Sequence, residues 1–200
     1  MHFNTSGLDV QEKYRLLNGG VTPRPIAWIS TRSKEGIDNL APYSFFTVAS
    51  CNPPVLLYTQ VTQRSGIDKD TLQNLKATGE CVVNIVNLPL LEKMNTTSAS
   101  IAIDESEFDL AEVEHSASKI VTPRSVKGSP IRYECTLREI ITLGDLPAGG
   151  TVVLLDVKSV YVRDDLYSGE GINQELIDSV GKMGGDGFSP TSTYISLNRP

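Results

Sequence analysis

The stretch IRYECTLREII, residues 131–141, decides the class of fold because its side chains alternate in character along its length. One face carries apolar residues, with Glu139 as the single interruption: Ile131, Tyr133, Cys135, Leu137 and Ile141. The opposite face carries polar residues: Arg132, Glu134, Thr136 and Arg138. Successive side chains of a strand point to opposite sides of a sheet, so this period of two predicts a β-strand with one buried face.

The flanking sequence predicts further strands in hairpin order. Residues 151–162 form a second long strand, and the glycine-containing segment 144–150 joins it to the first as a hairpin loop. Upstream, alternation and β-branched side chains predict three more strands: 25–31, 55–60 and 80–87. Residues 40–50 form another extended segment, in which Pro42 favours an irregular or edge geometry because proline cannot donate to a sheet ladder.

Short helices are expected between the strands. Residues 69–78 are predicted to form one, with Asp70 as its N-cap and Gly79 as its stop. Two more short helices are expected at 89–95 and 175–180. The acidic stretch 96–118 is expected to be a solvated excursion with little regular structure.

About six strands in hairpin order, with few helices, predict a mainly β fold: an antiparallel barrel with short helical insertions. The sequence contains no internal repeat, and no change of composition marks a linker. Residues 1–200 are therefore expected to form a single domain.

Composition excludes several classes of partner and site. The formal charge of −6 opposes binding to nucleic acid or to an anionic membrane, and no stretch has the roughly 18 apolar residues of a membrane span. No signal segment precedes the first strand, so a cytoplasmic location is expected. Three widely spaced cysteines in apolar segments are expected to be buried, reduced thiols, and two distant histidines make a metal site improbable.

The sequence lacks the common motifs of nucleotide binding and nucleophilic catalysis. It contains no G-x-G-x-x-G, no P-loop and no G-x-S-x-G elbow. Reactive chemistry is therefore expected to come from a bound cofactor.

An anion site is one candidate. Arg64 and Ser65 precede Lys69, Asp70 and Thr71 at a predicted helix start, where free N–H groups and the helix dipole favour a phosphate. From spacing alone, an ordinary capped surface helix explains the same residues.

An aromatic segment is the second candidate. Tyr43, Ser44, Phe45 and Phe46 follow Pro42, which can expose backbone N–H groups of an irregular strand. A flat, mostly apolar cofactor ring needs packing surface and a few donors aimed at one edge. From composition alone, the same residues could simply belong to the barrel core.

Taken in order, several segments resemble the flavin reductase-like family, which includes flavoredoxin and the reductase components of two-component monooxygenases. The resemblance spans roughly residues 14 to 190 and is carried by these segments: RPIAWIST (24–31), NLAPYSFF (39–46), the prolines at 53–54, KDTLQNL (69–75), GECVVN (79–84), Met94 with Asn95, Ser129 with Pro130, Glu134 with Cys135, and Gly184 with Gly185. The ordered set is specific for the family and weak for any one reaction within it.

This resemblance implies an FMN-binding split β-barrel that works as a homodimer. By similarity, Tyr43, Ser44, Phe45 and Phe46 border the flavin, and Lys69, Asp70 and Thr71 hold its phosphate, with Arg64 and Ser65 nearby. Asn84 lies on a strand behind the ring, while Arg24 and Trp28 are possible neighbours, although Trp28 fits the core equally well.

The resemblance also implies an NAD(P)H-dependent flavin oxidoreductase that supplies reduced flavin. NADH or NADPH would stack on the exposed flavin face, and the electrons would leave as reduced FMN or pass to a monooxygenase or another acceptor. The alternative is a non-catalytic, flavoredoxin-like electron carrier, and a third reading is a ligand-binding barrel with an unrelated substrate. No proton-transfer residue is assigned.

Overall fold

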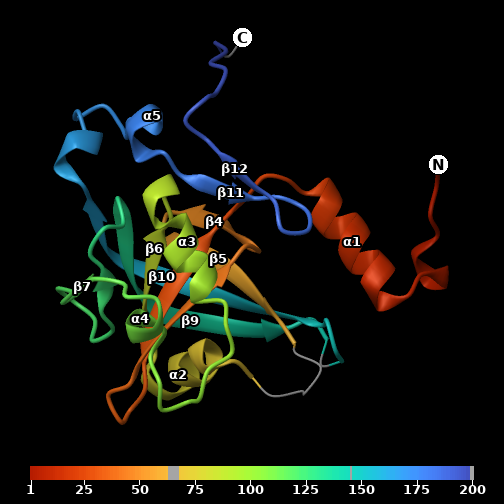
Figure 1. Cartoon of the computed structure of the whole chain (residues 1–200), viewed down its shortest axis with the longest axis horizontal. Helices are drawn as coiled ribbons and strands as arrows, with labels where there is room; N and C mark the ends of the chain where they lie inside the picture. The colour runs from red at the N-terminus through yellow and green to blue at the C-terminus, as the bar shows by residue number, and fades with distance from the viewer. Residues whose placement is uncertain (63–67, 145, 199–200) are drawn as a thin grey trace.

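The computed structural model describes residues 1–62, 68–144 and 146–198 (Figure 1). Its centre is a seven-stranded antiparallel sheet in the order β3-β2-β6-β9-β10-β5-β4. The strands are β2 (Ala27–Arg32), β3 (Asp38–Tyr43), β4 (Phe46–Cys51), β5 (Pro54–Val61), β6 (Glu80–Ile85), β9 (Ile131–Thr142) and β10 (Gly150–Val162). The mainly β, antiparallel split-barrel class expected from the sequence is confirmed.

The sheet curls because its two edge strands are consecutive in the chain. β3 and β4 lie at opposite ends of the strand order, yet only Ser44 and Phe45 separate them. The Thr59 N–H on β5 donates to the Phe45 carbonyl at 2.7 Å, which ties this bend to the far side of the sheet. The bend splits the extended segment expected over 40–50 into two strands, and Pro42 lies on the edge strand β3 as expected.

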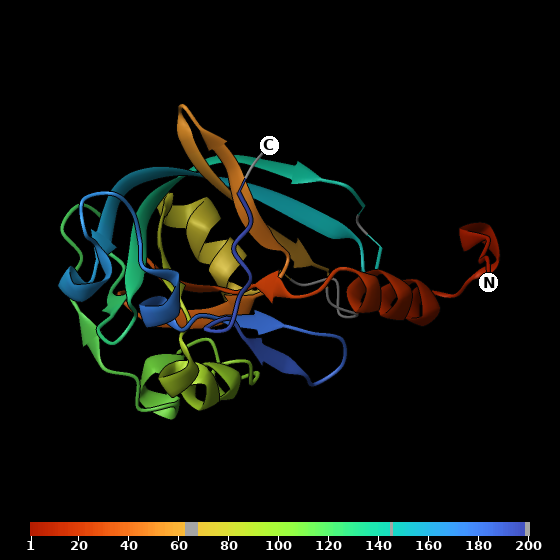
Figure 2. The same cartoon turned by 90° about the horizontal axis from the view of Figure 1, so that it is seen from above.

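A short helix fills the inside of the curl. Helix α2 (Asp70–Thr78) lies within the arch of the sheet in Figure 2, and it buries Leu72 and Leu75 in the barrel core. Gly79 ends the helix with a φ of 74°, as its position predicts. The N-cap, however, is Lys69 rather than Asp70, and it makes no side-chain capping bond, so the expected cap was one residue out.

A β-bulge in β9 changes which side chains reach the core. The pairing of β9 with β10 shifts between Leu137 and Glu139, so the alternation reverses after this point. Ile140 packs against the core, while Ile141, expected on the buried face, is 40% exposed. Simple alternation could not predict the bulge because the extra residue depends on the partner strand.

A second apolar layer covers the other face of the sheet. It contains Trp28, Leu40, Val86 and Phe108, and it packs beneath η2 (Leu88–Leu90), α3 (Leu91–Thr96) and α4 (Glu107–Leu110). The stretch 96–118 was expected to be a solvated excursion, and this was wrong for its second half. Phe108 anchors α4 in this layer, and β7 (His115–Ser116) pairs with β8 (Ser125–Val126).

Smaller elements surround the barrel. Near the N-terminus are η1 (Thr5–Gly7), α1 (Val10–Gly20) and β1 (Arg24–Pro25); near the C-terminus are η3 (Asp164–Leu166), α5 (Gln174–Ile177), β11 (Val180–Lys182) and β12 (Phe188–Pro190). Helix α1 projects from the body in both ribbon views (Figures 1 and 2). The helix expected over 175–180 is present but ends before Val180, which already belongs to β11.

The cysteines divide into two groups. Cys81 and Cys135 are fully buried cross-strand neighbours in the barrel core, as expected. Cys51 is exposed at the end of β4, which contradicts its expected burial. In the described part of the chain, no helix is long and apolar enough to cross a membrane, and no group of acidic, His or Cys side chains is arranged to hold a metal ion.

Candidate functional site

The aromatic segment forms the bend that joins the two edges of the split barrel. Tyr43 ends β3 and Phe46 begins β4, and both side chains pack on the barrel core. Ser44 and Phe45, between them, are partly exposed. A bend between strands leaves backbone groups without ladder partners, which is the property a ring-binding segment requires.

Tyr43 lies deep in this bend and is only 6% exposed. Its ring lies 4.8 Å from that of Tyr58, and its hydroxyl lies 3.5 Å from Oε1 of the buried Gln60. Burial raises the pKa of the Tyr43 hydroxyl well above its usual range, so it stays protonated at neutral pH. Tyr43 can therefore contribute packing, but no charge.

The start of α2 meets the bend. The Lys69 ammonium lies 5.5 Å from the centre of the Tyr43 ring, so the two segments singled out from the sequence are neighbours in space. Burial lowers the pKa of Lys69, and the charge of Glu107 partly opposes this shift. A bound anion here would favour the charged form of the lysine.

Thr71 is fully buried, and its hydroxyl is used inside the protein. It donates to Oδ1 of Asn39 at 2.8 Å, so this hydroxyl is not available as a donor to a phosphate. The Asn39 amide in turn donates to both carboxylate oxygens of Glu107, at 2.9 and 3.0 Å. This buried chain fixes the first turn of α2 against β3 and α4.

Glu107 is a site residue that sequence reasoning missed. It is 5% exposed and also accepts the Leu40 N–H at 2.9 Å. Burial raises its pKa, while the bonds from Leu40 and Asn39 oppose the shift. Its place in an acidic run concealed it, and the adjacent Phe108, an apolar side chain in a polar stretch, was the available signal.

A cleft of about 330 Å³ opens beside the start of α2. Its wall includes Lys69 together with three carboxylates, those of Asp68, Asp70 and Glu107. Burial raises the pKa of Asp70, as it does that of Glu107. The cleft itself is therefore a poor place for a phosphate.

Ser44 and Phe45 adjoin Arg24, whose side chain is 7% exposed. The Arg24 Nε donates to Ser44 Oγ at 3.3 Å, and the guanidinium carbon lies 5.9 Å from the centre of the Phe45 ring. The sequence singled out Arg24 as a possible neighbour of the site, and the structure puts it against the bend.

Two predicted residues lie away from this assembly. Asn84 is on the opposite face of the sheet, where its amide donates to the Trp28 carbonyl at 2.9 Å and accepts from the Val126 N–H at 2.9 Å. Trp28 is fully buried and donates to Thr97 Oγ1, so it belongs to the second apolar layer. Two further predicted residues lie outside the described residues: Arg64 and Ser65.

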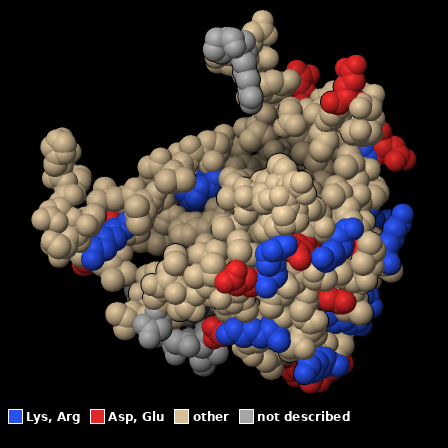
Figure 3. Space-filling model, turned by 180° about the vertical axis from the view of Figure 1, so that it is seen from behind, with Lys and Arg blue, Asp and Glu red and all other residues tan. Residues whose placement is uncertain are grey.

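A hollow lies between α1 and the body of the molecule. A cavity of about 660 Å³ is lined by residues of one face of α1, including Asn18, by Thr62 at the end of β5, and by Gly184 with Gly185. Figure 3 shows a hollow bordered mainly by uncharged residues, with basic atoms in its depth, while most charged side chains on that view gather elsewhere. The Asn18 carbonyl accepts from Arg24 at 2.6 Å, so this cavity is next to the bend.

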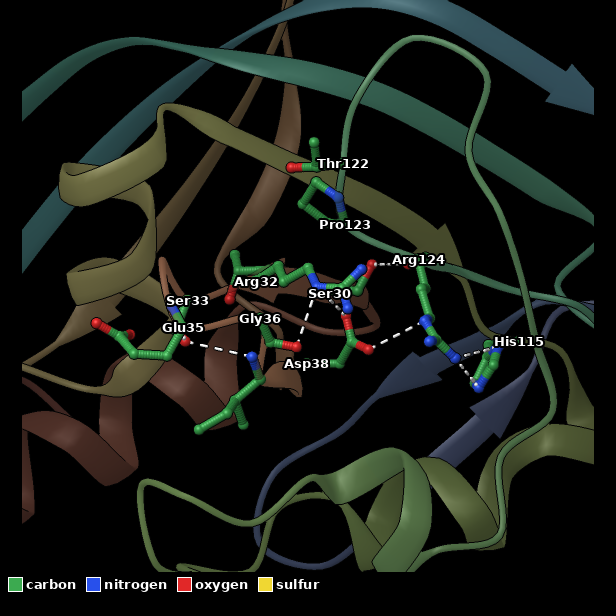
Figure 4. A network of polar contacts seen from close by, with 12 residues as sticks. Ser30, Arg32, Ser33, Glu35, Gly36, Asp38, His115, Thr122, Pro123 and Arg124 are labelled. Atoms are coloured by element: carbon green, nitrogen blue, oxygen red, sulfur yellow. Dashed lines mark hydrogen bonds and ion pairs between the residues drawn. The ribbon is translucent and has the colours of Figure 1, made fainter.

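A separate polar cluster holds the β2–β3 turn to the segment before β8 (Figure 4). Asp38 pairs with Arg32 at 3.6 Å and with Arg124 at 3.1 Å, and Arg124 also contacts the His115 ring. None of the predicted site residues takes part in it. The cluster therefore serves to hold these loops together.

Comparisons with known proteins agree with this arrangement. Residues 19–178 match the model of the flavin reductase like domain. The chain is 34% identical, over 100% of its length and 97% of the relative, to the uncharacterized protein BH2278 of Halalkalibacterium halodurans. The class of protein is defined by two features. One is a split barrel with an aromatic bend at its open edge, and the other is a helix beside that bend whose N-cap is a lysine. The chain belongs to the flavin reductase-like family.

Two solved structures are closely similar. Nitrilotriacetate monooxygenase component B from Bacillus cereus has a TM-score of 0.93 at 31% identity, with 98% of each chain covered. The 2-nitrobenzoate 2-nitroreductase NbaA of Pseudomonas fluorescens has a TM-score of 0.89 at 29% identity, covering 100% of this chain and 96% of that one. Membership of the flavin reductase-like family implies that the chain binds a flavin.

The residues present fit a flavin. The N-cap of α2 is a lysine, whose side chain cannot accept hydrogen bonds from the first-turn N–H groups. The Leu72 N–H already donates to the Lys69 carbonyl at 2.9 Å, so within the described residues the N–H groups of Asp70 and Thr71 are the ones left for an anion. The bend supplies aromatic surface at Phe45, and Arg24 beside it supplies a cation. The helix start can hold a phosphate, and the bend can hold a ring.

Proposed function

We propose that this protein binds FMN and is an NAD(P)H-dependent flavin oxidoreductase. The observation that carries the proposal is the contact between Lys69 and Tyr43, because it joins an anion-binding helix start to an aromatic bend. Membership of the flavin reductase-like family supports the same cofactor class. FMN, rather than a larger flavin, matches a single phosphate position at one helix start.

The FMN ring would lie along the bend at Tyr43, Ser44, Phe45 and Phe46. Bound FMN would supply the redox chemistry, since its ring accepts a hydride from a reduced nicotinamide. The protein's part is to hold the ring with one face open and to keep the donor within hydride reach. The partial exposure of Ser44 and Phe45 is consistent with an accessible ring.

The FMN phosphate would lie at Lys69, Asp70 and Thr71, on the side of α2 that faces Tyr43. Backbone N–H groups at Asp70 and Thr71 would serve as donors, since the Thr71 hydroxyl is already bonded to Asn39. Arg64 and Ser65 belong to the proposed site as well, because they precede the N-cap Lys69 by only a few residues in the sequence.

We also propose a homodimer. Helix α1 presents an apolar stripe at Val10, Tyr14 and Leu17, and Val21 continues it just past the end of the helix; these residues are between 51% and 67% exposed. Their spacing of three and four residues places them on one helix face. The edge strand β4 adds Val48, 61% exposed, and an unpaired ladder edge. A second copy of the chain would cover these surfaces.

The test is a pair of measurements on the purified protein. Absorbance and FMN titration report binding, and anaerobic mixing with NADH or NADPH reports reduction through loss of the flavin absorbance. Bleaching by either nucleotide within minutes is the expected result. If only dithionite bleaches the bound flavin, the protein is an electron carrier of the flavoredoxin kind, and the reductase proposal is wrong.

A second candidate function is supported by one comparison. The similarity to the nitroreductase NbaA covers the whole chain, so a small aromatic acceptor is a reasonable alternative to free FMN or to a monooxygenase as the final electron acceptor. Oxidation of NAD(P)H that accelerates when a nitroaromatic acid is added to the FMN-loaded protein would favour it.

A further inference from the structure

Arg24 is a buried cation without an acidic partner. Its guanidinium is permanently charged, yet the residue is only 7% exposed. Among the described residues, no ion pair includes it. Removing a charge from water is costly unless another group compensates for it. The chain has a net charge of −6, so acidic residues are plentiful, but none pairs with Arg24 in this part of the structure.

The groups that do contact Arg24 are neutral. Its Nη1 donates to the carbonyls of Asn18, at 2.6 Å, and Val21, at 2.8 Å, while Nη2 donates to the Met183 carbonyl at 3.2 Å. Two of these carbonyls lie at the C-terminal end of α1, where the helix dipole provides roughly half a negative charge. Arg24 therefore caps α1, and its charge is met by the partial charges of neutral groups rather than by a carboxylate.

A second cation lies beside Arg24. Lys182 is the cross-strand partner of Arg24 in the pairing of β1 with β11. Its pKa is lowered first by burial and also by the charge of Arg24, with Asp186 acting in the opposite direction. Lys182 thus places a second positive charge near Arg24, and the Asp186 carboxylate offsets part of it.

This positive charge borders the bend. The Arg24 Nε donates to Ser44, and its guanidinium lies near the Phe45 ring. Asn18, which binds Arg24, also lines the cavity between α1 and the body. A ligand placed along the bend would therefore lie near a buried cation that has no carboxylate partner among the described residues.

We propose that Arg24 pairs with the negative charge of the reduced FMN ring, so that the protein binds reduced FMN more tightly than oxidised FMN. The inference rests on the proposed function. Hydride transfer from C4 of the nicotinamide to N5 of the ring breaks one C–H bond, forms one N–H bond and moves two electrons. The nicotinamide becomes a cation, and the ring gains one negative charge, shared by N1 and the C2 carbonyl oxygen. A cation beside this edge stabilises the reduced state selectively.

Arg24 thus has a structural role, capping α1, and an electrostatic role toward the flavin. The two predict different results. A cap holds the bend in place whatever the redox state of FMN. Its loss therefore weakens the binding of oxidised and of reduced FMN equally. A paired charge acts mainly on the reduced form, so its loss changes the ratio of the two affinities.

The experiment is an anaerobic titration of the full-length protein with oxidised FMN and with dithionite-reduced FMN. Wild type should bind the reduced form at least about tenfold more tightly. Arg24→Gln should lower this ratio by about tenfold, which lowers the two-electron potential of bound FMN by about 30 mV. Arg24→Lys, which keeps the charge, should retain most of the ratio, and the exposed Arg138→Gln is the matched control.

If thermal unfolding shows that Arg24→Gln folds poorly, Lys182→Gln tests the same electrostatic effect without disturbing the cap of α1. It should shift the ratio in the same direction by a smaller factor. Equal affinities for both forms in wild type, or an unchanged ratio in both Gln variants, would overturn the inference. Failure of wild type to bind oxidised FMN at all would instead overturn the proposed function.

Discussion

Replacing Lys69 by Ala is the most direct test of the phosphate site. The side chain lies at the N-cap of α2 and contacts Tyr43, and its pKa is lowered because it is partly buried. A charge-assisted hydrogen bond to phosphate contributes about 1.5–3 kcal/mol. The substitution should therefore weaken FMN binding by about ten- to one-hundred-fold.

The pH dependence gives a second measure of the same contact. Burial destabilises the ammonium form of Lys69 in the free protein, whereas a bound phosphate would restore it. Binding of FMN then takes up a proton, and affinity should fall as pH rises through the lowered lysine pKa, below the usual value of about 10.4. Lys69→Ala should remove this dependence.

Fluorescence titration of FMN against wild type and variant measures both effects. Lys127→Ala is the control, because that lysine forms an exposed ion pair with Glu114 at 2.9 Å, outside the described site. An FMN affinity for Lys69→Ala that equals that of wild type across the pH range would refute the phosphate assignment.

Three further outcomes are expected. Glu107→Ala should lower the free energy of unfolding by about 2–4 kcal/mol, because it leaves two buried donors unpaired. Replacement of the exposed Asp104 by Ala should change it by less than about 0.5 kcal/mol, and equal stabilities of the two variants in urea unfolding would contradict this prediction. A thiol reagent should modify only Cys51 in the folded protein and the two core cysteines after denaturation, so rapid modification of three thiols in the native state would be inconsistent with the fold. Leu17→Glu, on the exposed stripe of α1, should shift the protein from dimer to monomer in sedimentation, and an unaltered dimer would exclude this stripe from the interface.

The strands were predictable because their signal is local. Alternation over 131–141 and apolar runs over 80–87 and 151–162 each identify a strand without reference to its partner. The bulge in β9 was not predictable in this way. The bulge places Ile140, rather than Ile141, against the core. Only the register against β10 determines where the extra residue lies.

The candidate site shows the same division between local and distant information. Lys69 and the aromatic bend were identified from adjacent residues, and the contact of Lys69 with Tyr43 brings them together. The link between Glu107 and Asn39 joins residues 68 positions apart, so no short pattern contains it. For Asn84 the sequence predicts the strand but not the face of the sheet on which its side chain lies, and in the structure that face is the one opposite to the bend.

The split in the barrel explains why three features occur together: the proposed ring site, the buried Arg24, and the exposed apolar stripe of α1. Because β3 and β4 are edge strands joined by a two-residue bend, the barrel cannot close with a ladder at this point, and the bend is held instead by Thr59 on one side and by Arg24 on the other. Arg24 also fastens α1 to the body through the Asn18 carbonyl. The group proposed to meet the reduced ring thus also positions the helix proposed to form the dimer. A change in the charge of the ring can therefore affect α1 through the hydrogen bonds of Arg24. The dimer affinity of wild type should differ between oxidised and reduced FMN, and this difference should disappear in Arg24→Gln. Identical dimer affinities in both redox states of wild type would show that Arg24 does not couple the ring to the interface.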